Sequence, residues 1–193
     1  RGVLIPRDDT EVVVNLCINF LENRTDKKTV DLCSGSGAIA VALDKISGAE
    51  VTAVEIDETA FSYLETNVKE NNSSVKPVMA DALEICDTFA DGELDLIVSN
   101  PPYIKSADIE TLQKEVRLEP RLALDGGEDG YDFYREIVSR WSRKLKKGGA
   151  LAFELGEGQA DAVKALMTDK GFSDFKISLD FGGVQRAIIG TLL

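Results

Sequence analysis

The chain contains no histidine, and this absence narrows the chemistry open to it. Ser–His and Cys–His nucleophiles and metal binding through imidazole are excluded, and we expect no metal. Cysteine is scarce: Cys17, Cys33 and Cys86 are odd in number, widely spaced and not grouped like metal ligands. We therefore expect free, buried thiols in a reducing compartment, the cytoplasm.

Long apolar runs and an excess of positive charge are also missing. No run approaches the ~20 residues of a membrane span, and no signal peptide is visible, so we expect no contact with a membrane. Lys and Arg number 22 against 34 Asp and Glu, which gives a net charge of −12 and disfavours a nucleic-acid partner. One basic cluster is interpreted as a solvated helix face: Arg135, Arg140, Arg143, Lys144, Lys146 and Lys147.

The remaining composition fits one domain. A chain of 193 residues that is 44% hydrophobic can bury one well-packed core. We expect a monomer. The chain opens on Arg1 rather than Met, and Arg1–Leu4 already reads as a strand. We therefore expect an excised domain, with a further segment missing upstream.

Helix and strand signals alternate from end to end, which predicts an α/β fold with a mostly parallel, seven-stranded sheet covered on both faces. Strands are expected at 29–33, 50–55, 75–79, 94–99, 150–154, 175–179 and 187–192. Helices are expected from a cap at Asp9 or Thr10 to 22, from 38 to 45, at 58–70, through 134–145 and at 158–170. Gly148-Gly149 should end the fourth helix, and Gly182-Gly183 should join the last two strands as an antiparallel pair.

A glycine loop, Ser34-Gly35-Ser36-Gly37, separates the first strand from its crossover helix. Glycines there allow a tight turn and bring a ligand close to main-chain N–H groups. Glu55 ends the second strand about 20 residues further on, where a carboxylate can accept both hydroxyls of an adenosine ribose. Asp81 and Ala82 follow the third strand and are expected to border the adenine. These features predict an adenosine-containing cofactor.

The glycine loop leaves two cofactors open. Gly35-Ser36-Gly37-Ala38-Ile39-Ala40 fits the dinucleotide pattern, so a nicotinamide dehydrogenase is one interpretation. Two observations favour S-adenosyl-L-methionine instead: Asp31 precedes the loop, where it can bind the ammonium of a methionine moiety, and the closing antiparallel strands are typical of methyltransferases. We also expect Cys33 to contact this cofactor.

A second loop, Asn100-Pro101-Pro102-Tyr103, follows an apolar strand and has no role in hydride transfer. The prolines fix two φ angles and carry no N–H, so the loop presents acceptors without competing donors. Parallel sheets place their chemistry at this end of the strands. The loop therefore predicts a site that receives a planar NH2 group.

Together these residues resemble class I methyltransferases that modify amide or amine nitrogens. Three further stretches are similar to the HemK/PrmC family, the bacterial N5-glutamine methyltransferases of peptide chain release factors: Ile5-Pro6-Arg7-Asp8-Asp9-Thr10-Glu11, Glu119-Pro120-Arg121-Leu122-Ala123-Leu124 and Gly126-Gly127-Glu128-Asp129-Gly130. The similarity covers nearly the whole chain. The chain departs from the family at Glu55, where Asp is also common, and at Ser34 and Ser36, where Thr is frequent.

The resemblance implies a class I, Rossmann-like methyltransferase domain that converts S-adenosyl-L-methionine to S-adenosyl-L-homocysteine. It implies methylation of the glutamine in the Gly-Gly-Gln motif of a release factor, and a small helical substrate-recognition domain that this chain lacks. Asn100 would accept one amide N–H through its side chain, the Pro101 carbonyl would accept the other, and Tyr103 would face the sulfonium.

Several roles and alternatives stay open. Arg7, Thr10 and Glu11 are expected either to form a wall over the cofactor or to cap the first helix. Glu119 and Pro120 are expected at the substrate entrance, and Trp141 in the core. The same acceptor loop also suits an adenine-N6 or other nucleic-acid amino methyltransferase. A non-catalytic cofactor-binding module is the third interpretation.

Overall fold

A computed structural model of the chain describes residues 3, 7–114 and 116–193. In this part of the chain seven strands form one sheet, in the order β3-β2-β1-β4-β5-β7-β6. The strands are β1 (Lys28–Leu32), β2 (Glu50–Glu55), β3 (Lys76–Met79), β4 (Leu94–Ser99), β5 (Leu145–Glu154), β6 (Phe172–Leu179) and β7 (Gln185–Leu192). The first five are parallel, and β7 runs antiparallel to both β5 and β6. The predicted fold class is confirmed.

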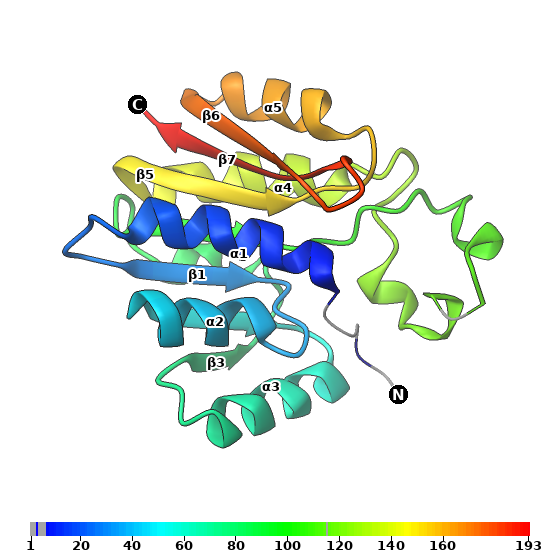
Figure 1. The fold of residues 1–193 in the computed structure, drawn as a ribbon, viewed down its shortest axis with the longest axis horizontal. Coiled ribbons are helices and arrows are strands. Elements are labelled where there is room, and N and C mark those ends of the chain that lie inside the picture. Colours follow the sequence, from blue (N-terminus) through cyan, green and yellow to red (C-terminus); the bar gives the residue numbers. More distant parts are fainter. Residues whose placement is uncertain (1–2, 4–6, 115) are drawn as a thin grey trace.

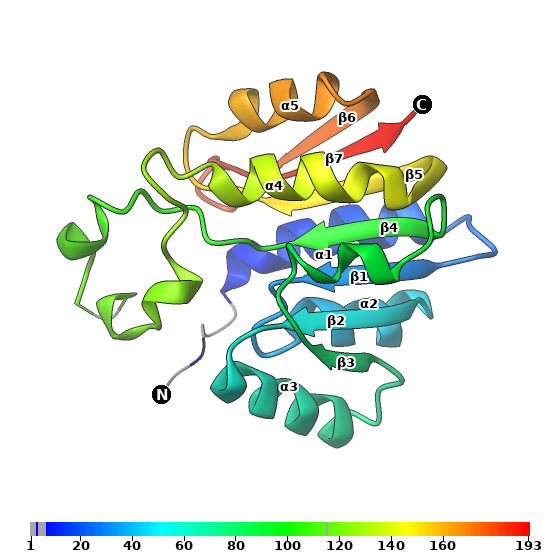
Figure 2. The same ribbon diagram turned by 180° about the vertical axis from the view of Figure 1, so that it is seen from behind.

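Helices cover both faces of the sheet (Figures 1 and 2). They are α1 (Asp8–Leu21), α2 (Ala38–Ser47), α3 (Glu58–Glu70), α4 (Asp132–Trp141) and α5 (Ala160–Thr168). Helices α1 to α3 share a core with one face, and α4 and α5 share a second core with the other. Among the described residues, no helix is both long and apolar enough to cross a bilayer.

Alternate side chains of strand β5 belong to the two different cores. Ala150 and Ala152 face α1, whereas Leu151 and Phe153 face α4 and α5. Successive side chains of a strand point to opposite faces, so small and large residues alternate between the cores. Trp141 is fully buried in the second core, as predicted.

The site is positioned by the neighbouring strands β1 and β4, between which the strand order reverses. Leu32 pairs with Ser99 at the carboxyl ends of these strands, and the Ser99 hydroxyl donates to the Leu32 carbonyl at 2.8 Å. The glycine loop starts two residues after Leu32, and the Asn-Pro-Pro-Tyr loop starts one residue after Ser99. The fold therefore brings both predicted motifs to its topological switch point, where α/β sheets bind ligands.

Residues 104–114 and 116–130 form a largely irregular segment beyond the carboxyl ends of the strands, drawn in green in Figure 1. The described part of the segment contains short 3-10 turns, η2 (Ile109–Thr111), η3 (Val116–Leu118) and η4 (Arg121–Ala123). Val3 apart, the expected strand at residues 1–4 lies outside the described residues. So do Ile5 and Pro6 of the family-like stretch.

The prediction for residues 142–149 was wrong. Helix α4 ends at Trp141 and a 3-10 turn, η5, covers Ser142–Lys144, so Leu145 belongs to β5 rather than to the helix. Gly148 and Gly149 lie within β5, where the pairing with β4 shifts register. Gly148 has φ +76°, and a Cβ on Gly149 would lie 3.1 Å from the Leu94 carbonyl. These glycines allow an irregularity within the strand. A glycine pair in the sequence is equally typical of a strand irregularity and of the end of a helix.

Two other local predictions need correction. Helix α1 begins at Asp8 with Arg7 at the N-cap position and no side-chain cap, so both predicted caps, Asp9 and Thr10, lie inside its first turn, and Thr10 donates its hydroxyl to Glu154. The basic cluster is not a free solvated face. Lys144 is buried and paired with Asp91, and Lys146 pairs with Asp95. Acidic neighbours distant in sequence thus neutralise charges that look clustered along the chain.

Candidate active site

The glycine loop leaves β1 in a conformation that favours glycine. Gly35 and Gly37 have φ +56° and +81°, and Cys33 has φ +58°. A Cβ on Gly37 would lie 2.3 Å from Leu64 Cδ1 of α3, whereas a Cβ on Gly35 would meet no atom within 4 Å. Gly37 is therefore required for helix packing, and Gly35 keeps open the space in front of the loop.

Glu55, at the end of β2, is locked to this loop. One carboxylate oxygen accepts the Gly35 N–H at 2.7 Å, and the other accepts the N–H groups of Ile56 and Asp57, both at 2.8 Å. The side chain is only 7% exposed, and it lines the cavity in front of the loop. Its orientation is therefore fixed before any ligand arrives.

That cavity is an open cleft of about 1090 Å³, solvent at its mouth included. The predicted residues that line it are Cys33, Ser34, Gly35, Ser36, Glu55, Asp81, Ala82, Asn100 and Pro102. Its outer wall includes Pro120 and Leu122 from the irregular segment. The mixture of apolar walls with a few polar groups is typical of a small-molecule binding site.

Asp31, in β1 beneath the glycine loop, does not line the cleft. Its side chain is fully buried, and neither carboxylate oxygen has a hydrogen-bond partner among the described residues. Burial raises the pKa of this carboxyl to about 8. An unpartnered buried carboxylate is costly, and a ligand cation would relieve that cost.

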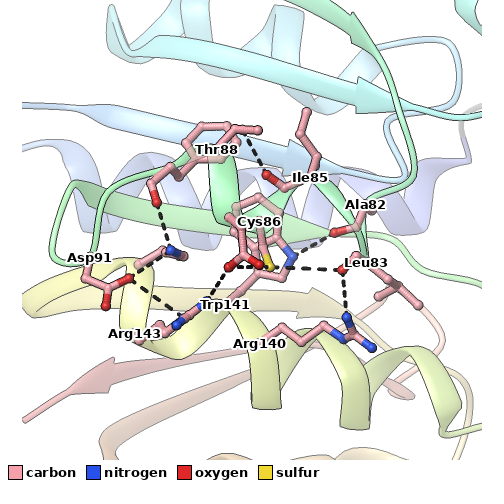
Figure 3. A network of polar contacts seen from close by, with 12 residues as sticks. Ala82, Leu83, Ile85, Cys86, Thr88, Asp91, Arg140, Trp141 and Arg143 are labelled. Carbon is pink, nitrogen blue, oxygen red and sulfur yellow. Dashed lines mark hydrogen bonds and ion pairs between the residues drawn. The ribbon is translucent and has the colours of Figure 1, made fainter.

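The loop after β3 is anchored from α4 (Figure 3). Trp141 Nε1 donates to the Ala82 carbonyl at 2.8 Å, and Arg140 donates to the Leu83 carbonyl at 3.2 Å. Asp81 accepts the Leu83 N–H through Oδ1 at 2.7 Å. The wall predicted to border an adenine is thus held in place by a fully buried side chain.

The Asn-Pro-Pro-Tyr loop is braced by the irregular segment. The Ile104 N–H donates to the Leu124 carbonyl at 2.9 Å, and the Gly126 N–H donates to the Ile104 carbonyl at 2.8 Å. A Cβ on Gly126 would lie 2.7 Å from Tyr103 Cα. Pro101 is buried behind the loop, so its side chain does not line the cleft. These contacts hold the Asn-Pro-Pro-Tyr loop against the main chain of the irregular segment.

Gln159 is a further support that the sequence analysis missed. Its amide nitrogen donates to the carbonyls of Tyr103 at 3.1 Å and Gly130 at 3.2 Å, and its oxygen accepts the Gly156 N–H and the Tyr134 hydroxyl. All these partners are distant in sequence or lie in a loop. The sequence feature that could have identified Gln159 is its position as a polar residue shortly after a strand, at the carboxyl edge of the sheet.

A smaller cavity of about 350 Å³ adjoins the cleft. The two share Thr10, Asn100 and Ala123, and the small cavity is also lined by Arg7, Tyr103 and Glu154. Glu154 was missed as well, although it ends β5 as Glu55 ends β2. Thr10 lines both cavities and Arg7 lines the small one only, whereas Glu11 is exposed on α1. Glu119 pairs with Arg7 at 3.1 Å.

Comparison with known proteins agrees with this geometry. The sequence profile of the Methyltransferase small domain matches residues 7–119. The release factor glutamine methyltransferase of Clostridium acetobutylicum is 38% identical over 98% of this chain and 67% of its own length. Those of Geobacter sulfurreducens and Fusobacterium nucleatum are 42% and 39% identical over 99% and 98% of this chain, and 66% and 54% of their own lengths. The chain thus spans between about half and two thirds of these curated relatives.

Solved structures share the fold at lower identity. A methyltransferase from Pyrococcus furiosus has a TM-score of 0.67 and 23% identity over 92% of this chain and 82% of that chain. The hMettl16 catalytic domain, solved with an RNA hairpin of the MAT2A 3′UTR, has a TM-score of 0.77 and 16% identity over 100% and 73%. At such identities the likeness concerns the fold alone.

These matches favour the methyltransferase interpretation of the glycine loop over the nicotinamide dehydrogenase. The profile covers more than half of the chain, and the curated relatives align along nearly all of it. The chain therefore belongs to the Methyltransferase small domain family and, within it, to the release factor glutamine methyltransferases.

Proposed function

We propose that this domain transfers a methyl group from S-adenosyl-L-methionine to the side-chain amide nitrogen of the glutamine in the Gly-Gly-Gln motif of a peptide chain release factor. The observation that carries the proposal is the junction of the large cleft and the small cavity at Asn100. The large cleft would hold the cofactor, and the small cavity would receive the end of the substrate side chain. A release factor as substrate places the reaction in the cytoplasm, and we expect the enzyme to act as a monomer.

The residues in and beneath the large cleft fit this cofactor. Asp31, below the glycine loop, is a buried carboxyl group without a hydrogen-bond partner among the described residues, suited to the ammonium of the methionine moiety. Gly35 leaves room that a Cβ would fill, and Glu55 is fixed for the ribose hydroxyls. Asp81 and Ala82 would border the adenine. When bound, the cofactor supplies an electrophilic methyl group on a sulfonium and leaves as S-adenosyl-L-homocysteine.

The acceptor side is formed by the Asn-Pro-Pro-Tyr loop. An amide nitrogen is a poor nucleophile, because its lone pair is delocalised into the carbonyl. The Asn100 side-chain oxygen and the Pro101 carbonyl would each accept one N–H and so orient the nitrogen. Both acceptors also stabilise positive charge as it develops there. Tyr103 would close the site beside the reacting groups, where a π-face tolerates positive charge.

Labelled S-adenosyl-L-methionine tests the proposal. The acceptors are a purified release factor, its Gln→Ala variant at the Gly-Gly-Gln motif and an adenine-containing DNA. We expect label on the wild-type factor alone, and an N100A enzyme that is slower by about 10²–10³-fold while still binding the cofactor. Label on the DNA would contradict the substrate and support the nucleic-acid alternative. Cofactor binding without transfer to either acceptor would contradict catalysis by this domain on its own.

A further inference from the structure

Glu154 lies at the acceptor side of the site, and the mechanism above gives it no role. It ends β5 at the carboxyl edge of the sheet and is 4% exposed. Its side chain lines the small cavity together with Asn100 and Tyr103. A buried carboxylate therefore borders the space assigned to the substrate amide.

The surroundings of Glu154 leave it without a direct counter-ion. One oxygen accepts the Thr10 hydroxyl at 2.8 Å. Arg186 is paired with Asp180 at 2.8 Å and with Asp9 at 3.3 Å, and Arg7 is paired with Glu119. In the described part of the chain no ion pair includes Glu154. The charged and titratable groups around it are Arg7 and Asp9 near the start of α1, Arg186 of β7, Tyr103 of the acceptor loop and Tyr134 of α4.

Burial raises the pKa of the Glu154 carboxyl above its ordinary value. The Thr10 hydrogen bond and the two arginines oppose this increase, and Asp9 adds to it. A carboxylate whose pKa is raised in this way is a stronger base than one in water.

Methyl transfer to an amide requires a proton acceptor. The nitrogen lone pair forms the new N–CH3 bond, and the S–CH3 electron pair stays on sulfur as the thioether forms. The nitrogen then carries two hydrogens, one methyl group and a positive charge. We propose that one N–H leaves its acceptor at Asn100 or Pro101 as the nitrogen becomes tetrahedral, and that Glu154 accepts its proton and later releases it to water; the inference rests on the proposed function.

Other groups at the site are poorly suited to accept the proton. Burial raises the pKa of Tyr103 to about 12, so its hydroxyl keeps its own proton, and Arg7 is a cation. In the large cleft, the Glu55 carboxylate is occupied by three main-chain N–H groups, and Asp81 accepts the Leu83 N–H. Among the described residues, Glu154 is the carboxylate that lines the small cavity, and Thr10 is the one hydrogen-bond partner of its side chain.

Glu154 has a second possible role, as a tether for α1 through Thr10, and two variants separate the roles. E154Q removes the charge but keeps an oxygen that can accept the Thr10 hydroxyl. T10V removes the hydrogen bond but keeps the carboxylate. A third variant, E157Q, makes the same chemical change at an exposed position three residues away and serves as the matched control.

The experiment measures single-turnover methyl transfer to a release factor between about pH 5 and about pH 9, with cofactor affinity determined separately. In the wild type the rate should rise with pH as Glu154 loses its proton. In E154Q this rise of the rate with pH, the acid limb of the profile, should disappear. The rate should fall by about 100-fold, which is the low end of the contribution of a positioned general base, and cofactor affinity should be unchanged. T10V and E157Q should retain the limb.

Two results would overturn the inference. The first is an E154Q enzyme that keeps the wild-type rate and acid limb. The second is a loss of rate shared equally by E154Q and T10V with the limb intact in both, because this would assign Glu154 to the tether. A wild-type enzyme that binds the cofactor but methylates no release factor would instead contradict the proposed function, and with it the premise of this role.

Discussion

The side-chain amide of Gln159 donates to the main-chain carbonyl of Tyr103 at 3.1 Å, across 56 residues of sequence. The same side chain satisfies the Gly130 carbonyl, the Gly156 N–H and the Tyr134 hydroxyl, so all its polar atoms are used. Fully satisfied buried amides rigidify their surroundings. Gln159 thus positions the end of the acceptor loop from behind, without lining either cavity.

We predict that Q159L destabilises the fold by about 3 kcal/mol, because it leaves several buried polar groups without partners. Methyl transfer should fall more than cofactor affinity, since the loop it supports is the acceptor loop. Urea unfolding and transfer rates test this. Q113L, the same change at an exposed glutamine, is the control. Equal unfolding midpoints for the two variants would refute the prediction.

Asp31 should make the stability of the cofactor-free protein depend on pH. Its pKa is about 8 in the fold against an ordinary value of 3.8. Between these values the folded state binds a proton that the unfolded state does not. The free energy of unfolding should therefore fall as pH rises from about 4 to about 8. D31N should flatten this slope, as measured by urea unfolding at several pH values.

The same variant should weaken cofactor binding. Removing one partner of a buried charge pair costs about 2–5 kcal/mol, so D31N should raise the Kd by at least about 30-fold. Calorimetric titration with S-adenosyl-L-methionine measures this change. D161N, on the exposed side of α5, is a control with the same chemistry. Tight binding by D31N would show that the carboxylate does not serve the ammonium.

The two loop glycines should respond differently to alanine. G37A places a methyl group against the buried Leu64 and at a positive φ, so we expect a loss of about 2–3 kcal/mol in stability. In G35A the new methyl group contacts no neighbouring atom, so the expected loss of about 1 kcal/mol in stability comes from the positive φ alone. Its methyl group occupies the cleft, so cofactor affinity should fall about tenfold. Thermal unfolding and cofactor titration separate the effects, and the reverse order of stabilities would contradict the assignment.

Trp141 should influence cofactor binding from the far side of the adenine wall. W141F removes the hydrogen bond to the Ala82 carbonyl and part of a fully buried ring, at a cost of about 2–4 kcal/mol. Cofactor affinity should decrease as the loop after β3 loosens. R140M removes the exposed contacts of Arg140 with the Leu83 carbonyl and with Glu136, and it should have little effect. Equal cofactor affinities in W141F and R140M would argue against this anchor.

Much of the fold follows from local patterns. The predicted bounds of β2, α3 and β4 agree with the structure at every residue, because turn signals on both sides delimit them. The same local reasoning failed at Gly148-Gly149. A glycine pair marks an interruption, but only the pairing of β4 with β5 decides that the interrupted element is a strand.

By itself, the sequence determined the fold class, the two loops and their place at the carboxyl ends of β1 and β4. Strand periodicity, glycine and proline act over a few residues and therefore can be read along the chain. Tertiary structure alone decided that Gly37 packs against Leu64, that Asp31 has no hydrogen-bond partner within the described part of the chain, and that Glu154 accepts the Thr10 hydroxyl beside the acceptor loop. These properties depend on which distant side chains exclude water from a group, and local sequence does not specify that environment.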